Sequence, residues 1–106
     1  MLMLTTVSSQ GLSYGNYYWP PNGPVSCPNW DPRPRCGGGL HGLPWGVGDW
    51  GLLSSDPTDS WLVWRADGQV VQFRGLGKVQ VGEVLYCDDR QGALDYLTTH
   101  GGREVW

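Results

Sequence analysis

The sequence predicts an α+β domain with a small, mostly antiparallel sheet, one C-terminal helix and a long, packed loop layer rich in Pro, Gly and Trp. Its 106 residues are enough for a single compact domain spanning 1–106. Most strand-like segments are joined by short turns, which allow antiparallel pairing but not parallel pairing. Seven Trp and five Tyr supply apolar area that offsets the cost of ordering a chain with 17 Gly and 8 Pro.

Two strands are expected before the first prolines. Leu2–Val7 alternates in the manner of a strand, and a turn follows it at residues 8–13. Tyr14–Trp19 contains strand-favouring aromatic residues. It must stop at Pro20, because proline lacks the amide hydrogen that a strand ladder needs.

The middle of the chain, residues 20–51, is rich in proline and glycine and yet contains Trp30, Trp45 and Trp50. Flexible linkers do not usually carry several tryptophans. We therefore expect an ordered loop layer that packs across one face of the sheet.

The second half predicts a hairpin and then a further strand. Ser60–Ala66 and Gln69–Arg74 flank Asp67-Gly68, a dipeptide that suits a type I′ turn because both central positions need positive φ. Lys78–Cys87 alternates as a strand, with a bulge expected at Gly82.

A short helix is expected after that strand. Asp88 or Asp89 can cap its N-terminus, and Gly101 can close its C-terminus in the left-handed conformation. Its predicted inward face consists of Ala93, Leu94 and Leu97.

Charge and cysteine content narrow the choice of partners and location. The formal charge is -3 and the arginines are scattered, which argues against binding to duplex nucleic acid. The chain has no run of 18 apolar residues, and Met1–Leu4 lacks the basic start of a signal peptide, so neither a membrane nor export is expected. We expect a cytoplasmic protein whose three cysteines are reduced thiols.

The most unusual segment is Cys36-Gly37-Gly38-Gly39-Leu40-His41-Gly42. Backbone amides without side chains can approach a ligand closely, and an imidazole beside them can donate or accept a hydrogen bond. A ligand-binding site is therefore predicted, lined by Gly37, Gly38, Gly39, His41, Arg35, Trp45 and Trp64. The alternative is a tight corner in which His41 is hydrogen-bonded inside the domain.

The tryptophans of the predicted hairpin bear on this site. Trp61 and Trp64 are three residues apart in a strand, so they face opposite sides of the sheet. An exposed indole can stack on a planar ring such as a base. Alternatively, the loop layer covers that second face and buries the indole.

Other chemistry is weakly indicated. Cys27, Cys36, His41 and Cys87 are potential zinc ligands, but their spacing is unlike that of paired structural zinc ligands, so no metal and no cofactor are expected. Ser54, Ser55 and Asp56 form no nucleophile motif and suit a turn, while Asp88 and Asp89 suit a helix cap.

Four motifs resemble those of a group of small domains encoded by phages and by bacteria, especially actinobacteria. They are Ser13-Tyr14-Gly15, Tyr18-Trp19-Pro20, Asn29-Trp30-Asp31-Pro32 and Cys36-Gly37-Gly38-Gly39-Leu40-His41-Gly42-Leu43. The similarity extends over almost the full length and implies a phage-type protein, but no particular activity. A looser similarity, to the split sheet of mono-ADP-ribosyltransferases, directs attention to His41 and Glu83.

Our leading functional hypothesis is a non-enzymatic binding module that counters host defence. It would hold either a nucleotide-like signal or a defence protein of the host, and a homo-oligomer could place the ligand between subunits. The first alternative is a nucleotide-processing enzyme of ADP-ribosyltransferase-like fold, and the second is a structural or accessory domain.

Overall fold

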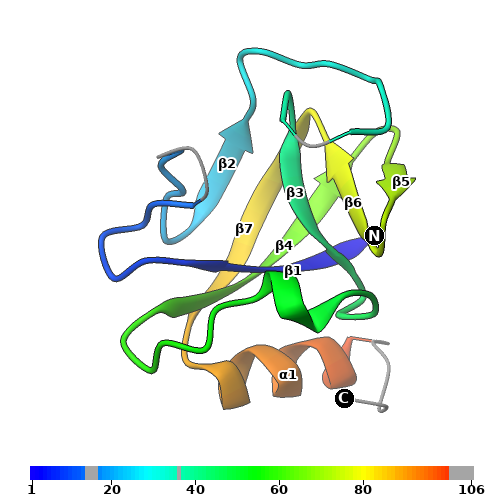
Figure 1. Ribbon diagram of the computed structural model, residues 1–106. Coiled ribbons are helices and arrows are strands. Elements are labelled where there is room, and N and C mark those ends of the chain that lie inside the picture. The colour runs from blue at the N-terminus through cyan, green and yellow to red at the C-terminus, as the bar shows by residue number, and fades with distance from the viewer. Residues whose placement is uncertain (14–16, 36, 101–106) are drawn as a thin grey trace.

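One antiparallel sheet of seven strands and one C-terminal helix make up the described part of the chain, residues 1–13, 17–35 and 37–100 of a computed structural model (Figure 1). The strands run in the order β2-β7-β4-β1-β3-β6-β5. The elements are β1 (Leu2–Val7), β2 (Gly23–Ser26), β3 (Leu40–Pro44), the 3-10 helix η2 (Trp50–Leu52), β4 (Ser60–Asp67), β5 (Val71–Phe73), β6 (Leu76–Val79), β7 (Val81–Asp88) and α1 (Arg90–Thr99). The predicted α+β class is confirmed. In these residues, no helix has the length and apolarity to span a membrane.

Strand β1 forms the middle of the sheet because it is apolar on both faces. Adjacent residues Met3 and Leu4 point to opposite faces and both are fully buried. Thr5, the next residue, is also buried, because its hydroxyl makes two hydrogen bonds. It donates to the His41 carbonyl (2.7 Å) and accepts from the Trp64 indole (3.0 Å).

The first face of the sheet curls around a core built on Trp64. Val25, on edge strand β2, and Val79, on β6, belong to the same apolar cluster although four strands lie between β2 and β6. Trp19 fills the middle of this cluster, with its ring centroid 5.1 Å from that of Trp64. The sheet must therefore be strongly curved around these indoles.

The second face is covered by α1 and η2 (Figure 1). The predicted inward residues Ala93, Leu94 and Leu97 are buried there against Trp61. Trp61 and Trp64 therefore face opposite sides, as predicted, and the protein buries both.

The start of α1 agrees with the sequence prediction. Asp89 is the N-cap residue, and its carboxylate accepts from the Gly92 amide (2.9 Å). Gly101, the predicted C-terminal residue of the helix, lies outside the described residues.

The predicted hairpin across Asp67-Gly68 is wrong. Strand β4 pairs with β1 and β7, whereas β5 lies at the far edge of the sheet on β6. The tight hairpin turn is Arg74-Gly75, between β5 and β6, where φ is 47° and 76°. The turn preference of Asp67-Gly68 reflects only the local sequence. The partners of β4 are set instead by its side chains, which are buried on both faces and place the strand in the interior of the sheet.

The single strand predicted at Lys78–Cys87 is two strands, β6 and β7, with different partners. The register shift occurs opposite Val63/Trp64 in the β4–β7 ladder, not at Gly82. Gly82 has a packing role instead, since a Cβ there would lie 2.5 Å from the Arg65 carbonyl oxygen.

The strand predicted at Tyr14–Trp19 is absent from the described residues 17–19, where Tyr18 forms one isolated bridge with Leu12; residues 14–16 lie outside the description. The segment 20–51 is not a loop layer alone, because it contains β2, β3 and the start of η2. Its buried Val25 and Leu40 join the Trp64 cluster. A strand prediction misses them because proline and glycine dominate the local composition.

Candidate binding cleft

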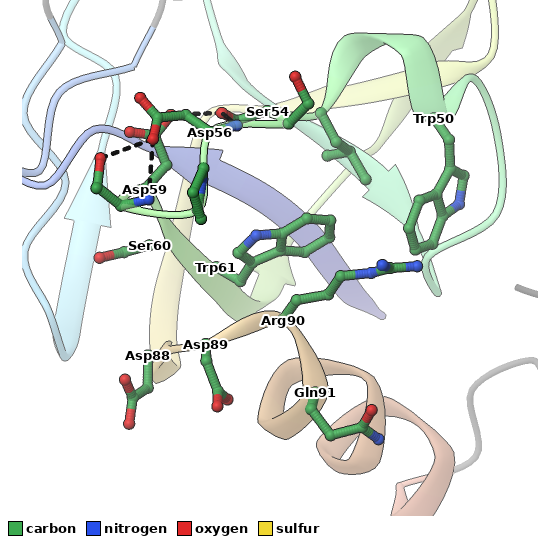
Figure 2. A pocket seen from close by; sticks show the side chains of 14 residues that line it. Trp50, Ser54, Asp56, Asp59, Ser60, Trp61, Asp88, Asp89, Arg90 and Gln91 are labelled. Carbon is green, nitrogen blue, oxygen red and sulfur yellow. Dashed lines mark hydrogen bonds between the residues drawn. The ribbon is translucent and has the colours of Figure 1, made fainter.

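A cleft of about 740 Å³ opens between the loop 53–60 and the N-terminal end of α1 (Figure 2). We call it the acidic cleft. Its lining residues are Trp50, Leu53, Ser54, Ser55, Asp56, Pro57, Thr58, Asp59, Ser60, Trp61, Asp88, Asp89, Arg90 and Gln91. The sheet register creates it, because Trp61 at the start of β4 pairs with Asp88 at the end of β7. This volume is typical of small-ligand sites.

One wall of the acidic cleft is aromatic and carries a single cation. The ring centroids of Trp50 and Trp61 are 5.7 Å apart. The Arg90 guanidinium lies 5.6 Å from the Trp50 centroid and 5.9 Å from the Trp61 centroid, within cation–π range. Figure 2 shows the Arg90 side chain running below Trp61 toward Trp50. Trp50 is held in place by a hydrogen bond from its indole to the Gly46 carbonyl (2.9 Å).

The opposite wall is polar and is shaped by its own hydrogen bonds. Ser54 ties the loop to the sheet, because its amide donates to Thr6 Oγ1 (2.9 Å) and its hydroxyl donates to Asp59. The Asp56 carboxylate accepts from the amide and the hydroxyl of Thr58. These bonds lower the pKa of Asp56 and favour its charged form.

Two more carboxylates lie where β7 meets α1. Asp88 is exposed, and Asp89 accepts from the Gly92 amide and from the Tyr86 hydroxyl (3.0 Å). The Gly92 bond, followed by the Tyr86 bond, lowers the pKa of Asp89. Desolvation, followed by the hydrogen bond to Asp89, raises the pKa of Tyr86 to about 12.

Four carboxylates and one guanidinium therefore line the acidic cleft. Its net charge attracts cations and repels phosphates and other anions. The guanidinium of Arg90 takes part in none of the salt bridges among the described residues. The four carboxylates of the cleft take part in none of these salt bridges either, so they are available to a second cation.

The predicted glycine loop lies elsewhere and is held by internal contacts. The Gly37 amide donates to His41 Nε2 (3.2 Å), and the Asp31 amide donates to the Gly38 carbonyl (2.7 Å). Lys78, fully buried, donates to the carbonyls of Arg35 and Gly37, each at 3.0 Å. These contacts are those of the tight corner that the sequence left open as an alternative.

Packing also accounts for two of the three glycines. A Cβ at Gly38 would lie 2.4 Å from the Asp31 Cβ, and one at Gly39 would crowd Lys78 and Trp30 at 3.1 Å. A Cβ at Gly37 would meet nothing within 4 Å, but its φ of 91° still favours glycine.

The other predicted ligand residues are dispersed. The Arg35 guanidinium pairs with Asp31 (3.1 Å), which also binds Arg33. Trp64 is fully buried and bonded to Thr5, so no ligand reaches it in this conformation. Trp45 lines a different hollow, described below. Ligand binding at the Gly37–His41 loop therefore stays a prediction.

The residues named for the alternative functions are not brought together. Glu83, on β7, binds Arg65 (3.0 Å), and two strands separate β7 from β3, which carries His41. Cys27 and Cys87 are free, and Cys36 lies outside the described residues. Within the described ranges, no three His, Cys, Asp or Glu side chains are placed to hold a metal ion.

The sequence identified Asp56 only as a turn residue and Asp88 and Asp89 only as cap residues, and it did not single out Asp59. This assignment is correct for Asp89, the N-cap residue, and for Asp56, whose carboxylate accepts from the Thr58 amide. The missing signal is the pairing of β4 with β7, which depends on contacts distant in sequence. Comparisons with protein-family models, with curated proteins and with solved structures found no match to this chain. The phage-type resemblance stays a prediction.

Proposed function

We propose that the protein is a non-enzymatic binding module whose acidic cleft holds a cationic side chain of a partner protein. The observation that carries the proposal is that Asp56 and Asp59 on one side and Asp88 and Asp89 on the other line a single cleft with an aromatic wall. An arginine or lysine entering from solvent meets carboxylates at the mouth, a contact that favours a cation. The faces of Trp50 and Trp61 within are already occupied by the Arg90 guanidinium, so the carboxylates provide the selectivity for the partner's cation.

Charge favours one of the two ligand classes expected from the sequence. A nucleotide-like signal carries phosphates, which would face four carboxylates and only one guanidinium, that of Arg90. A basic segment of a host defence protein has the complementary charge. The cleft therefore supports the protein-binding version better than the nucleotide version.

The cleft is built for binding before a partner arrives. Hydrogen bonds within the loop and at the N-cap fix Asp56, Asp59 and Asp89 without neutralising them. A preformed anionic pocket loses little conformational freedom when a cation enters, which is the general source of affinity from preorganisation. Phage origin, a host partner, cytoplasmic location and homo-oligomerisation remain proposals that accompany this one.

An NMR titration tests the proposal. The uniformly ¹⁵N-labelled protein is titrated with an acetylated, amidated peptide containing two arginines, with a matched peptide containing two glutamates, and with AMP. We expect the arginine peptide alone to shift the amides of residues 54–61 and 88–91 and the indole N–H signals of Trp50 and Trp61. Equal shifts with the glutamate peptide or AMP, or shifts confined to other residues, would contradict the proposal.

A further inference from the structure

The backbone is left-handed at ten described residues, and eight of them are glycine. The two exceptions are Trp45 (φ 56°) and Arg74 (φ 47°). A left-handed backbone is unfavourable for a residue with a Cβ, and residues with a strained backbone of this kind concentrate at functional sites. Both exceptions line the same hollow, so a large aromatic side chain and a cation stand where glycine would be free of strain.

This hollow has about 500 Å³ and lies apart from the acidic cleft, with which it shares no residue. We call it the Trp45 hollow. Its lining residues are Met1, Pro44, Trp45, Val47, Gln72, Phe73, Arg74, Gly75 and Leu76. Arg74 is the only charged side chain among them, and the salt bridges of the described residues do not include it.

The two turns that carry Trp45 and Arg74 are fixed against each other. The Asp49 amide donates to the Gly75 carbonyl (2.9 Å), and a Cβ at Gly48 would lie only 2.1 Å from that oxygen. The Trp45 amide donates to the Leu2 carbonyl (2.8 Å), which anchors its turn to β1. The backbone that carries Trp45 and Arg74 is thus held in place on both sides of the hollow.

We propose that the Trp45 hollow is a second binding site, which takes a small aromatic anion. The planar ring of the ligand lies against Trp45 and Phe73, and its anionic group binds the guanidinium of Arg74. The aromatic side chains provide the apolar contact, and the unpaired guanidinium beside a wall free of carboxylates provides the charge selection. This site is independent of the cationic partner proposed for the acidic cleft.

The probes are 2-naphthoate, its neutral isostere 2-naphthamide and its cationic analogue 2-naphthylmethylammonium, each titrated into ¹⁵N-labelled protein. We expect naphthoate to bind most tightly and to shift the Trp45 indole and the amides of residues 45–47 and 73–76. Arg74→Asn removes the cation but tolerates a left-handed backbone. It should weaken naphthoate binding about tenfold and remove its advantage over naphthamide. Arg65→Gln, an exposed arginine of β4 outside the hollow, should leave the affinity unchanged.

Arg74→Gly repeats the test with the backbone strain removed and serves if the asparagine variant does not fold. Naphthamide binding as tightly as naphthoate to the wild-type protein would overturn the proposal. Unchanged naphthoate affinity in the folded Arg74 variant, or shifts confined to residues 54–61 and 88–91, would overturn it as well.

Discussion

Trp61 on β4 lies directly opposite Asp88 on β7 in the antiparallel ladder. This pairing places the end of the loop 53–60 beside the start of α1, two segments about 30 residues apart in the chain. The register thereby brings Trp61 and Asp88 into the lining of one cleft. The acidic cleft is a product of sheet register, and its chemistry depends on which strands pair.

Arg90 is expected to limit the affinity of the acidic cleft for cations. Its guanidinium occupies the faces of Trp50 and Trp61 and is the only positive charge in the lining. Arg90→Gln should strengthen binding of the two-arginine peptide about threefold, because a like charge is removed. Calorimetric titration measures the change. Weaker binding in this variant would show that Arg90 does not compete with the ligand.

The N-cap of α1 should contribute measurably to folding. Asp89→Ala removes the acceptor for the Gly92 amide, so the free energy of unfolding should fall by about 1 kcal/mol. Asp89→Asn retains a capping oxygen and should lose much less. Urea unfolding of the three proteins provides the comparison, and equal losses in both variants would argue against a capping role.

Lys78 is expected to hold the glycine loop in place. Lys78→Met keeps the volume but leaves the carbonyls of Arg35 and Gly37 without a donor. We expect a loss of about 1–3 kcal/mol in unfolding free energy. Amide hydrogen exchange should accelerate at Asp31, whose amide bonds to Gly38 in the same loop. Unchanged exchange at Asp31 would contradict the role assigned to Lys78.

The stability of the protein should decrease as the pH falls through the pKa of His41. Burial, followed by the charge of Lys78, lowers this pKa from its ordinary value of 6.5 in the folded protein. The unfolded chain then binds more protons than the folded protein between the two pKa values. The His41 contribution is therefore complete above pH 6.5 and is lost progressively below it.

Urea unfolding at pH 7.5 and 5.5, at constant ionic strength, measures this effect. His41→Gln should reduce the difference in unfolding free energy between the two pH values, because the titrating group is gone. The same pH dependence in His41→Gln and wild type would show that another group is responsible.

Backbone strain at Arg74 should be visible in stability. Arg74→Gly relieves a left-handed backbone at φ 47° and should stabilise the protein by about 0.5–1 kcal/mol, after the entropy gained by the unfolded chain is subtracted. Arg74→Ala keeps the strain and should change stability little. If alanine stabilises as much as glycine, the side chain and not the backbone is the source of the effect.

Local features of the fold could be predicted from the sequence. The alternation of Leu2–Val7 indicated β1, and Asp89 with Ala93, Leu94 and Leu97 indicated the cap and the buried face of α1. Each of these signals lies within a single element. The class of fold followed because the connections between most elements are short.

Strand pairing could not be predicted in the same way. The Asp67-Gly68 dipeptide has a turn composition, but the apolar residues on both faces of β4 place that strand between β1 and β7. Arg74-Gly75 makes the tight turn although arginine gives no local signal for positive φ. The glycine loop was recognised as unusual, but Lys78, which holds it, is 41 residues from Gly37.

The central claim is that the carboxylates of the acidic cleft bind a cationic group of a partner. Calorimetric titration of the two-arginine peptide into the wild-type protein and the Asp56→Asn/Asp88→Asn double variant tests it most directly. Asp67→Asn, a carboxylate of β4 outside the cleft, is the matched control. We predict at least about tenfold weaker binding for the double variant than for the wild-type protein. The affinity of the Asp67→Asn control should be unchanged. Equal affinity of the wild-type protein and the double variant would contradict the claim.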